Sequence, residues 1–178
     1  QQLHARTDPD VAADGDAAAF AAILDRHYAG LFGLCFRLTG ARPEAEDLCQ
    51  DICLALPGKI SSYAGQAKLT TWLYRVAVNA AHDRRRKQAR HAKARDGWGD
   101  WEANRRAADA ETATQIDWLH QAMGALPETL RDTLALTLDD ITHAEAAEIL
   151  GVSEGTVSWR ISQARKALRA MRTAEDAP

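Results

Sequence analysis

The segment from Thr142 to Met171 constrains the fold most, because its start, its turn and its second helix are all specified locally. Thr142 followed three residues later by Glu145 forms a capping box, which predicts the start of a short helix. Gly151 can adopt the left-handed backbone conformation of a tight turn, and Ser153 can cap a second helix. The pattern therefore predicts a helix-turn-helix.

The second helix of this motif has a polar, basic outer face. Between Arg160 and Arg172 it carries five Lys/Arg residues and no acidic residue. Such a helix suits the major groove of DNA, where polar side chains meet base edges and cations neutralise phosphates. An ordinary helical hairpin is the alternative, and the run of cations argues against it. The candidate contacts are Ser153, Glu154, Thr156, Ser158, Trp159, Arg160, Ser162, Gln163, Arg165 and Lys166.

A second basic segment lies near the middle of the chain. The net charge of the 178 residues is −3, so overall charge does not predict a nucleic-acid partner. Arg84 to Arg95, however, holds seven Lys/Arg and no acid, and the two basic segments together hold 12 of the 22 basic residues. This distribution indicates two separate anionic contacts. Two solvated helix faces are the alternative interpretation.

The rest of the chain reads as helices, since strand-forming runs are few and Ala, Leu, Arg and Glu are abundant. We expect an all-α fold with two small helical domains joined by a flexible linker. The domains are 15–95 and 114–172, with the linker at 96–113. In the first domain the expected elements are a helix over 17–39, a second from Pro43 that ends at Pro57-Gly58, a loop over 59–68 and a helix over 70–95.

The sequence does not predict a redox or metal site, a catalytic site or a membrane segment. Cys35, Cys49 and Cys53 lie in apolar helical patterns, so we expect buried thiols; a metal site or redox pair at Cys49 and Cys53 is the alternative. No metal, cofactor or catalytic constellation is predicted. No signal peptide or membrane-spanning run is present, so we expect a cytoplasmic protein with no membrane insertion.

Trp98 and Trp101 are unusual in a linker and suggest docking, either on this protein or on a partner.

Three motifs resemble those of extracytoplasmic-function (group IV) sigma factors of the bacterial sigma-70 family, and they follow one another in the same order as in that family. The C-terminal motif resembles their −35-binding domain, and two earlier motifs resemble their core-polymerase-binding and promoter-melting helices. The matching segments are Leu126-Pro127 with residues 144–157 and 164–168, residues 44–51, and residues 71–79 with Asp83-Arg84-Arg85. The resemblance covers about residues 15–95 and 114–172.

The resemblance implies a transcription initiation factor with no enzymatic activity, which binds core RNA polymerase and reads −35 and −10 promoter DNA. It also implies an anti-sigma protein as a partner, and no cofactor. Core polymerase would contact Asp47, Gln50 and Asp51. The −10 element would contact a loop and the helix that follows it, through Ser62, Tyr63, Gln66, Lys68, Trp72, Arg75, Asn79, Arg84, Arg85, Arg86 and Lys87. Trp72 also suits the core, because it lies on the apolar face of its helix.

The chain departs from the family in two places. Pro57 stands where relatives continue their second helix, and Trp159 and Gln163 occupy recognition-helix positions that are often polar or basic. The second departure leaves the preferred −35 sequence open. Two other functions remain as alternatives: a stand-alone helix-turn-helix regulator, which would leave residues 43–95 unexplained, and a sigma mimic that titrates an anti-sigma protein.

Overall fold

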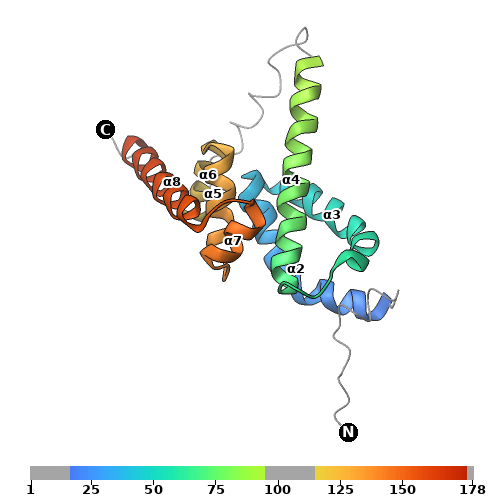
Figure 1. Ribbon diagram of the computed structural model, residues 1–178. Helices are drawn as coiled ribbons and strands as arrows, with labels where there is room; N and C mark the ends of the chain where they lie inside the picture. The colour runs from blue at the N-terminus through green and yellow to red at the C-terminus, as the bar shows by residue number, and fades with distance from the viewer. Residues whose placement is uncertain (1–16, 95–114, 176–178) are drawn as a thin grey trace.

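The computed structural model describes residues 17–94 and 115–175, and every regular element within these ranges is helical. Figure 1 shows these helices in their order along the chain. The all-α expectation is confirmed. The predicted linker and the pair Trp98 and Trp101 lie outside the described residues. None of the described helices combines the length and apolar character needed to span a membrane.

Residues 17–94 form the N-terminal unit. Its helices are α2 (Ala17–Thr39), α3 (Arg42–Lys59) and α4 (Leu69–Ala94), with a short 3-10 helix, η1 (Ile60–Ser62), after α3. Helix α2 packs against both α3 and α4. The apolar residues Leu34, Leu48 and Val78, one from each helix, are fully buried between them. Apolar residues at three- and four-residue spacing thus form the shared core, as the sequence predicts.

The prediction that Pro57-Gly58 ends the second helix is wrong. Helix α3 continues through Pro57 to Lys59, and η1 follows directly. A proline inside a helix removes one backbone donor and crowds the carbonyl four residues earlier. Here the disturbance falls in the last turn, where little helix remains to be disrupted. Leu56 and Ile60 on either side are buried, so side-chain packing holds this turn in place.

Residues 115–175 form the C-terminal unit. It contains α5 (Gln115–Ala125), α6 (Glu128–Thr137), α7 (His143–Leu150) and α8 (Glu154–Glu175). Pro127 directly precedes α6, as expected for a residue that cannot donate a backbone hydrogen bond. Met123, Leu136 and Val157 are fully buried and join the helices in one core.

The two units pack against each other, an arrangement that the sequence leaves open. Helix α2 contacts α5 and α6, α4 contacts α7, and the buried apolar residues of both units form one continuous cluster. Arg37 of α2 donates from Nε to the carbonyl of Ala135 at 2.9 Å and forms an ion pair with Asp139. The ring of Phe36 meets the edge of His120 with centroids 4.1 Å apart. We call this packed state the closed arrangement.

Gly40 sits where the two units approach each other closely at the end of α2. Its φ is +76°, a left-handed conformation that ends the helix and that other residues adopt at a cost. A Cβ at this position would lie 3.0 Å from the Cα of Gly124 and 3.2 Å from the carbonyl oxygen of His120. Glycine is therefore required here both by the turn and by the backbone of α5.

Candidate nucleic-acid interface

The helix-turn-helix is built by the caps that the sequence predicts. The Thr142 hydroxyl accepts from the amide of Glu145 at 3.2 Å, and the Glu145 carboxylate accepts from the amide of Thr142 at 2.9 Å. Gly151 is left-handed, with φ +65°, and Ser153 caps α8 by accepting from the Thr156 amide at 3.1 Å. These bonds fix the angle between α7 and α8 and confirm the predicted motif.

The carboxylate of Glu145 has a second partner outside the motif. Lys68 Nζ of the N-terminal unit lies 2.9 Å from Glu145 Oε1. The hydrogen bond from the backbone of Thr142, together with those from Lys68 and the Thr142 side chain, lowers the pKa of Glu145 to about 2. Since hydrogen bonds to the ionised form stabilise that form, Glu145 is a carboxylate throughout the physiological pH range.

Helix α8 buries one face and exposes the other. Val157, Ile161 and Ala164 face the core. Trp159 is 59% exposed, so its ring is available to a partner. Of the other predicted contacts, Thr156, Arg160 and Gln163 are half-buried, and the exposed ones are Ser153, Glu154, Ser158, Ser162, Arg165 and Lys166.

A basic groove runs between the start of α7 and the outer face of α8. Arg165, Lys166 and Arg169 line it together with Ser158 and Ser162. His143 also lines the groove, and its Nδ1 lies 3.2 Å from the Ser158 hydroxyl. Sequence reasoning missed His143. The signal available was its place as the first residue of α7, directly after the Thr142 cap of the predicted motif.

The second candidate surface begins at the loop before α4. The rings of Tyr63 and Trp72 lie 5.7 Å apart, and Trp72 is half-buried against the core. The Tyr63 hydroxyl donates to the carbonyl of Ala67 at 2.6 Å, and the Ser62 hydroxyl donates to that of Lys59 at 2.6 Å. Gln66 is exposed. The loop is therefore shaped by its own hydrogen bonds around a pair of neighbouring aromatic rings, and Trp72 combines a core contact with a partly exposed face.

Arg84 joins two sites that the sequence treats as separate. Its guanidinium lies 3.2 Å from a carboxylate oxygen of Asp47 and 3.3 Å from one of Asp51. Both aspartates are predicted polymerase contacts and are largely exposed on α3, as is Gln50. Arg84 thus links α4 to the acidic face of α3 through two ion pairs.

The other predicted polar contacts of α4 fall into two groups. Asn79, Arg86 and Lys87 are exposed to solvent. Arg75 and Arg85 instead contact carboxylates of the C-terminal unit. Arg75 Nη2 lies 2.6 Å from Glu148, and Arg85 Nη2 lies 2.9 and 3.1 Å from the two oxygens of Asp132.

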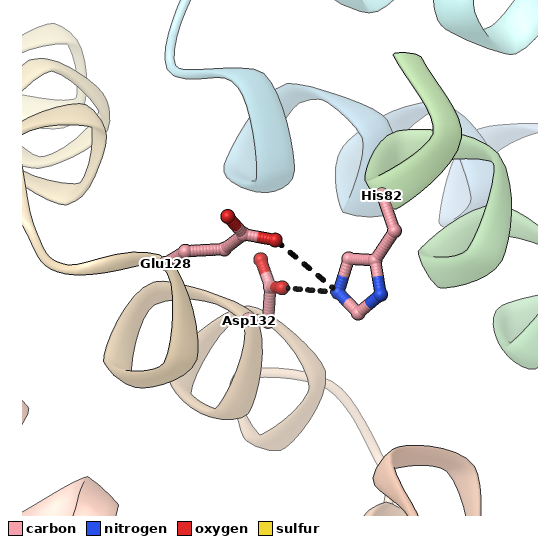
Figure 2. A group of neighbouring side chains, drawn as sticks. All are labelled: His82, Glu128 and Asp132. Carbon is pink, nitrogen blue, oxygen red and sulfur yellow. Dashed lines mark hydrogen bonds and ion pairs between the residues drawn. The ribbon is translucent and has the colours of Figure 1, made fainter. Parts of the chain in front are cut away.

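Figure 2 shows the group around Asp132, where His82 of α4 meets Glu128 and Asp132 of α6. His82 Nε2 lies 2.8 Å from Asp132 and 3.7 Å from Glu128. These side chains are types that bind transition metals, and their ligand atoms lie within 4.8 Å of one another. Arg85, however, already binds both oxygens of Asp132 and lies 3.2 Å from Glu128. Both carboxylates of the group are thus already paired with a cation, and we interpret the group as an ion-pair network.

The three thiols lie at the contact between α2 and α3. Cys35 and Cys49 are buried and Cys53 is partly buried. Burial raises the pKa of Cys53 to about 11 and raises that of Cys35 still further. Because the thiolate is the reactive form, these thiols are poor nucleophiles, which agrees with the expected core role.

Comparisons with known proteins match both units. The sigma-70 region 2 family matches residues 23–91, and the sigma-70 region 4 family matches residues 116–168. The chain is 32% identical to the ECF RNA polymerase sigma factor SigW of Bacillus subtilis, over 87% of this chain and 89% of SigW. It is also 32% identical to SigM of Mycobacterium tuberculosis H37Rv, over 93% of this chain and 84% of SigM.

Two solved structures share the fold. CnrH, in complex with the cytosolic domain of CnrY, matches with a TM-score of 0.68 and 25% identity over 94% of this chain and 96% of CnrH. The sigma factor RpoE of Bartonella quintana, in complex with the anti-sigma factor NepR, matches with a TM-score of 0.72 and 23% identity over 86% of this chain and 96% of RpoE. The region 2 match accounts for the residues that a stand-alone helix-turn-helix regulator leaves unexplained. The chain belongs to the extracytoplasmic-function sigma factors of the sigma-70 family.

Proposed function

We propose that this sigma factor holds promoter DNA at two surfaces, the α7–α8 groove for the −35 element and the α4 surface for the −10 element. As a member of its family, it directs RNA polymerase to promoters. The observation that carries the proposal is that α8 has two faces of different character. One face is buried in the core, and the other presents Trp159 and a row of cations on a motif built for the major groove.

At the −35 surface, we assign different kinds of contact to different residues. Arg165, Lys166 and Arg169 line the groove and suit phosphate contacts, which give affinity without sequence information. Trp159 and Ser162 are exposed and suit base edges, Trp159 through apolar contact with a thymine methyl. His143 adds one more polar group at the start of α7.

At the −10 surface, the Tyr63–Trp72 pair offers aromatic rings on which an unstacked base can pack. Arg86 and Lys87 extend the surface with exposed cations. Asp47, Gln50 and Asp51 present an acidic, exposed face on α3 for a basic surface of core polymerase. These roles require no catalytic step, and they suit a protein that works in the cytoplasm beside the chromosome.

We also propose an anti-sigma protein as a partner. The support is that the similar sigma factor RpoE was solved in complex with the anti-sigma factor NepR.

Reconstitution with sigma-free core polymerase and a promoter library tests the main proposal. We expect open complexes on a defined set of promoters that share two elements. Duplex binding as a dimer without core, and no initiation with it, would contradict the proposal. Tight binding to an anti-sigma protein with no initiation would instead identify a sigma mimic.

The phosphate contact at Arg165 can be tested separately on −35 duplex DNA. Arg165→Ala should weaken binding and reduce the slope of log K against log salt by about 0.9, the contribution of one duplex phosphate contact. Arg42→Ala is the matched control, because Arg42 is also exposed but belongs to α3 and does not line the α7–α8 groove. An unchanged slope for Arg165→Ala would rule out a phosphate contact at this position.

A further inference from the structure

Three of the cations proposed for the −10 surface are bound by carboxylates of the C-terminal unit. Lys68 lies 2.9 Å from Glu145, Arg75 lies 2.6 Å from Glu148, and Arg85 lies 2.9 Å from Asp132. The partners come from α6 and α7, while the cations lie just before α4, in its first half and in its middle. The C-terminal unit therefore contacts the proposed −10 surface at three points, from Lys68 to Arg85.

The contact at Asp132 is the most buried of the three. Asp132 is 2% exposed, and its carboxylate binds both His82 at 2.8 Å and Arg85 at 2.9 and 3.1 Å. Each of these close partners comes from α4. A carboxylate buried without such partners would be unfavourable, so Asp132 couples the two units and favours the closed arrangement.

A carboxylate and a phosphate diester compete for the same donors. Both present paired oxygens that a guanidinium binds through parallel N–H groups. The Nη2 groups of Arg75 and Arg85 cannot donate to a DNA backbone while Glu148 and Asp132 hold them. Helices α6 and α7 also cover part of the N-terminal unit in the closed arrangement, since α6 contacts α2 and α7 contacts α4.

We propose that the C-terminal unit is an intramolecular competitor of the −10 strand, whose carboxylates at Asp132, Glu145 and Glu148 occupy Lys68, Arg75 and Arg85 until the two units separate. The inference rests on the proposed function of the α4 surface. It assigns a different behaviour to the −35 surface, because Arg165 and Lys166 are exposed in the closed arrangement. The closed chain can therefore bind −35 duplex while its −10 surface is blocked.

The test measures two properties of the full chain: its radius of gyration by small-angle X-ray scattering, and its affinity for DNA by fluorescence anisotropy. The DNA probes are a −35 duplex and a labelled random-sequence single strand of roughly 15 nucleotides, long enough to span such a site. Random sequence suffices because cation contacts to phosphates do not depend on the bases.

Glu148→Gln removes the exposed carboxylate that pairs with Arg75 and leaves the capping box of Glu145 intact. We expect a roughly two- to five-fold gain in single-strand affinity, as for the loss of one exposed ion pair that opposes binding. Glu46→Gln is the matched control. Its side chain is 56% exposed, against 54% for Glu148, and it also pairs with an arginine, Arg42, but within α3. This variant changes the net charge equally and breaks a pair that does not join the units, so it should leave the affinity unchanged.

Asp132→Asn should act more strongly. It leaves Arg85 and His82 without their buried carboxylate, so we expect a larger radius of gyration and a gain in single-strand affinity on the order of ten- to a hundred-fold. Affinity for the −35 duplex should not change in either variant. The exchange Arg75→Glu with Glu148→Arg restores the pair with reversed charges. It should recover the compact radius that Arg75→Glu alone loses, and it should still bind the single strand weakly.

The outcomes separate this inference from the function on which it rests. If Glu148→Gln and Asp132→Asn bind the single strand no better than Glu46→Gln, the competition is refuted while the −10 surface stands. If the variants open but no protein binds the strand, the −10 surface itself is refuted. A free wild-type chain already as extended as Asp132→Asn would also overturn the competition.

Discussion

Replacing Gly40 by alanine should separate the cost of a strained backbone from the cost of a contact between the two units. Gly40 has φ +76°, where an L residue loses about 1–2 kcal/mol. The added Cβ would also lie 3.0 Å from Gly124 Cα and 3.2 Å from the carbonyl oxygen of His120, both backbone atoms of α5. Forcing such a contact in a packed core costs about 1–3 kcal/mol. The total loss for the closed arrangement is therefore about 2–5 kcal/mol.

The two parts of this cost act on different equilibria. The strain at φ remains whenever α2 is folded, but the contact with α5 disappears when the units separate. Gly40→Ala should therefore shift the balance from closed to open by roughly five-fold to over a hundred-fold, at about 1.4 kcal/mol for each factor of ten.

Gly65→Ala is the matched control, because Gly65 has φ +69° and no atom within 4 Å of an added Cβ. Denaturant unfolding and small-angle scattering should show a loss of about 1–2 kcal/mol with an unchanged radius of gyration for Gly65→Ala. Gly40→Ala should lose more and become more extended. Equal losses in the two variants, with equal radii, would show that the packing of α2 against α5 does not hold the units together.

Three further outcomes follow from individual residues. Pro57→Ala should raise the free energy of unfolding by about 1 kcal/mol, because it restores a donor to the last turn of α3; a lower stability would show that the proline ring packs usefully there. Glu145→Gln should destabilise the protein at neutral pH, and the difference from wild type should be full above the ordinary carboxyl pKa of 4.5 and vanish as pH falls towards the folded value of about 2. Unfolding curves at a series of pH values measure it, and a difference that persists at the lowest pH would contradict the assigned bonds. The three thiols should react slowly with a disulfide reagent at about pH 8 in the native chain and quickly after denaturation, whereas fast native reaction would contradict their burial.

The sequence predicts features that depend on neighbouring residues well, and contacts between residues far apart in the chain poorly. The caps at Thr142 and Ser153 and the turn at Gly151 depend on residues within a few positions, so their roles follow from local rules. The error at Pro57 has the opposite cause, since buried neighbours of the helix override a local preference. The pair Arg75 and Glu148 is separated by 73 positions, and each residue alone resembles ordinary solvated surface.

The role of Arg84 could not be predicted for the same reason. Its partners Asp47 and Asp51 lie 37 and 33 positions away on α3, and only the packing of α3 against α4 brings them together. His143 meets Ser158 because the turn folds α7 back on α8, which spacing alone does not reveal. In each case the residue type was visible and its partner was not.

Consecutive cations on α4 have different partners because consecutive residues on a helix point roughly 100° apart. Arg84 faces the acidic residues of α3, Arg85 faces Asp132 of α6, and Arg86 and Lys87 face solvent. Separation of the units would free Lys68, Arg75 and Arg85 but not Arg84, whose partners lie within the N-terminal unit. Of the contacts proposed for the −10 surface, a strand bound to the closed chain could thus meet the two exposed cations Arg86 and Lys87, which would contribute about 1.4 to the salt slope at about 0.7 per single-strand phosphate contact. Opening would add Lys68, Arg75 and Arg85 and so raise the slope by about 2.1, so the change in salt dependence between closed and open variants reports which arrangement binds DNA.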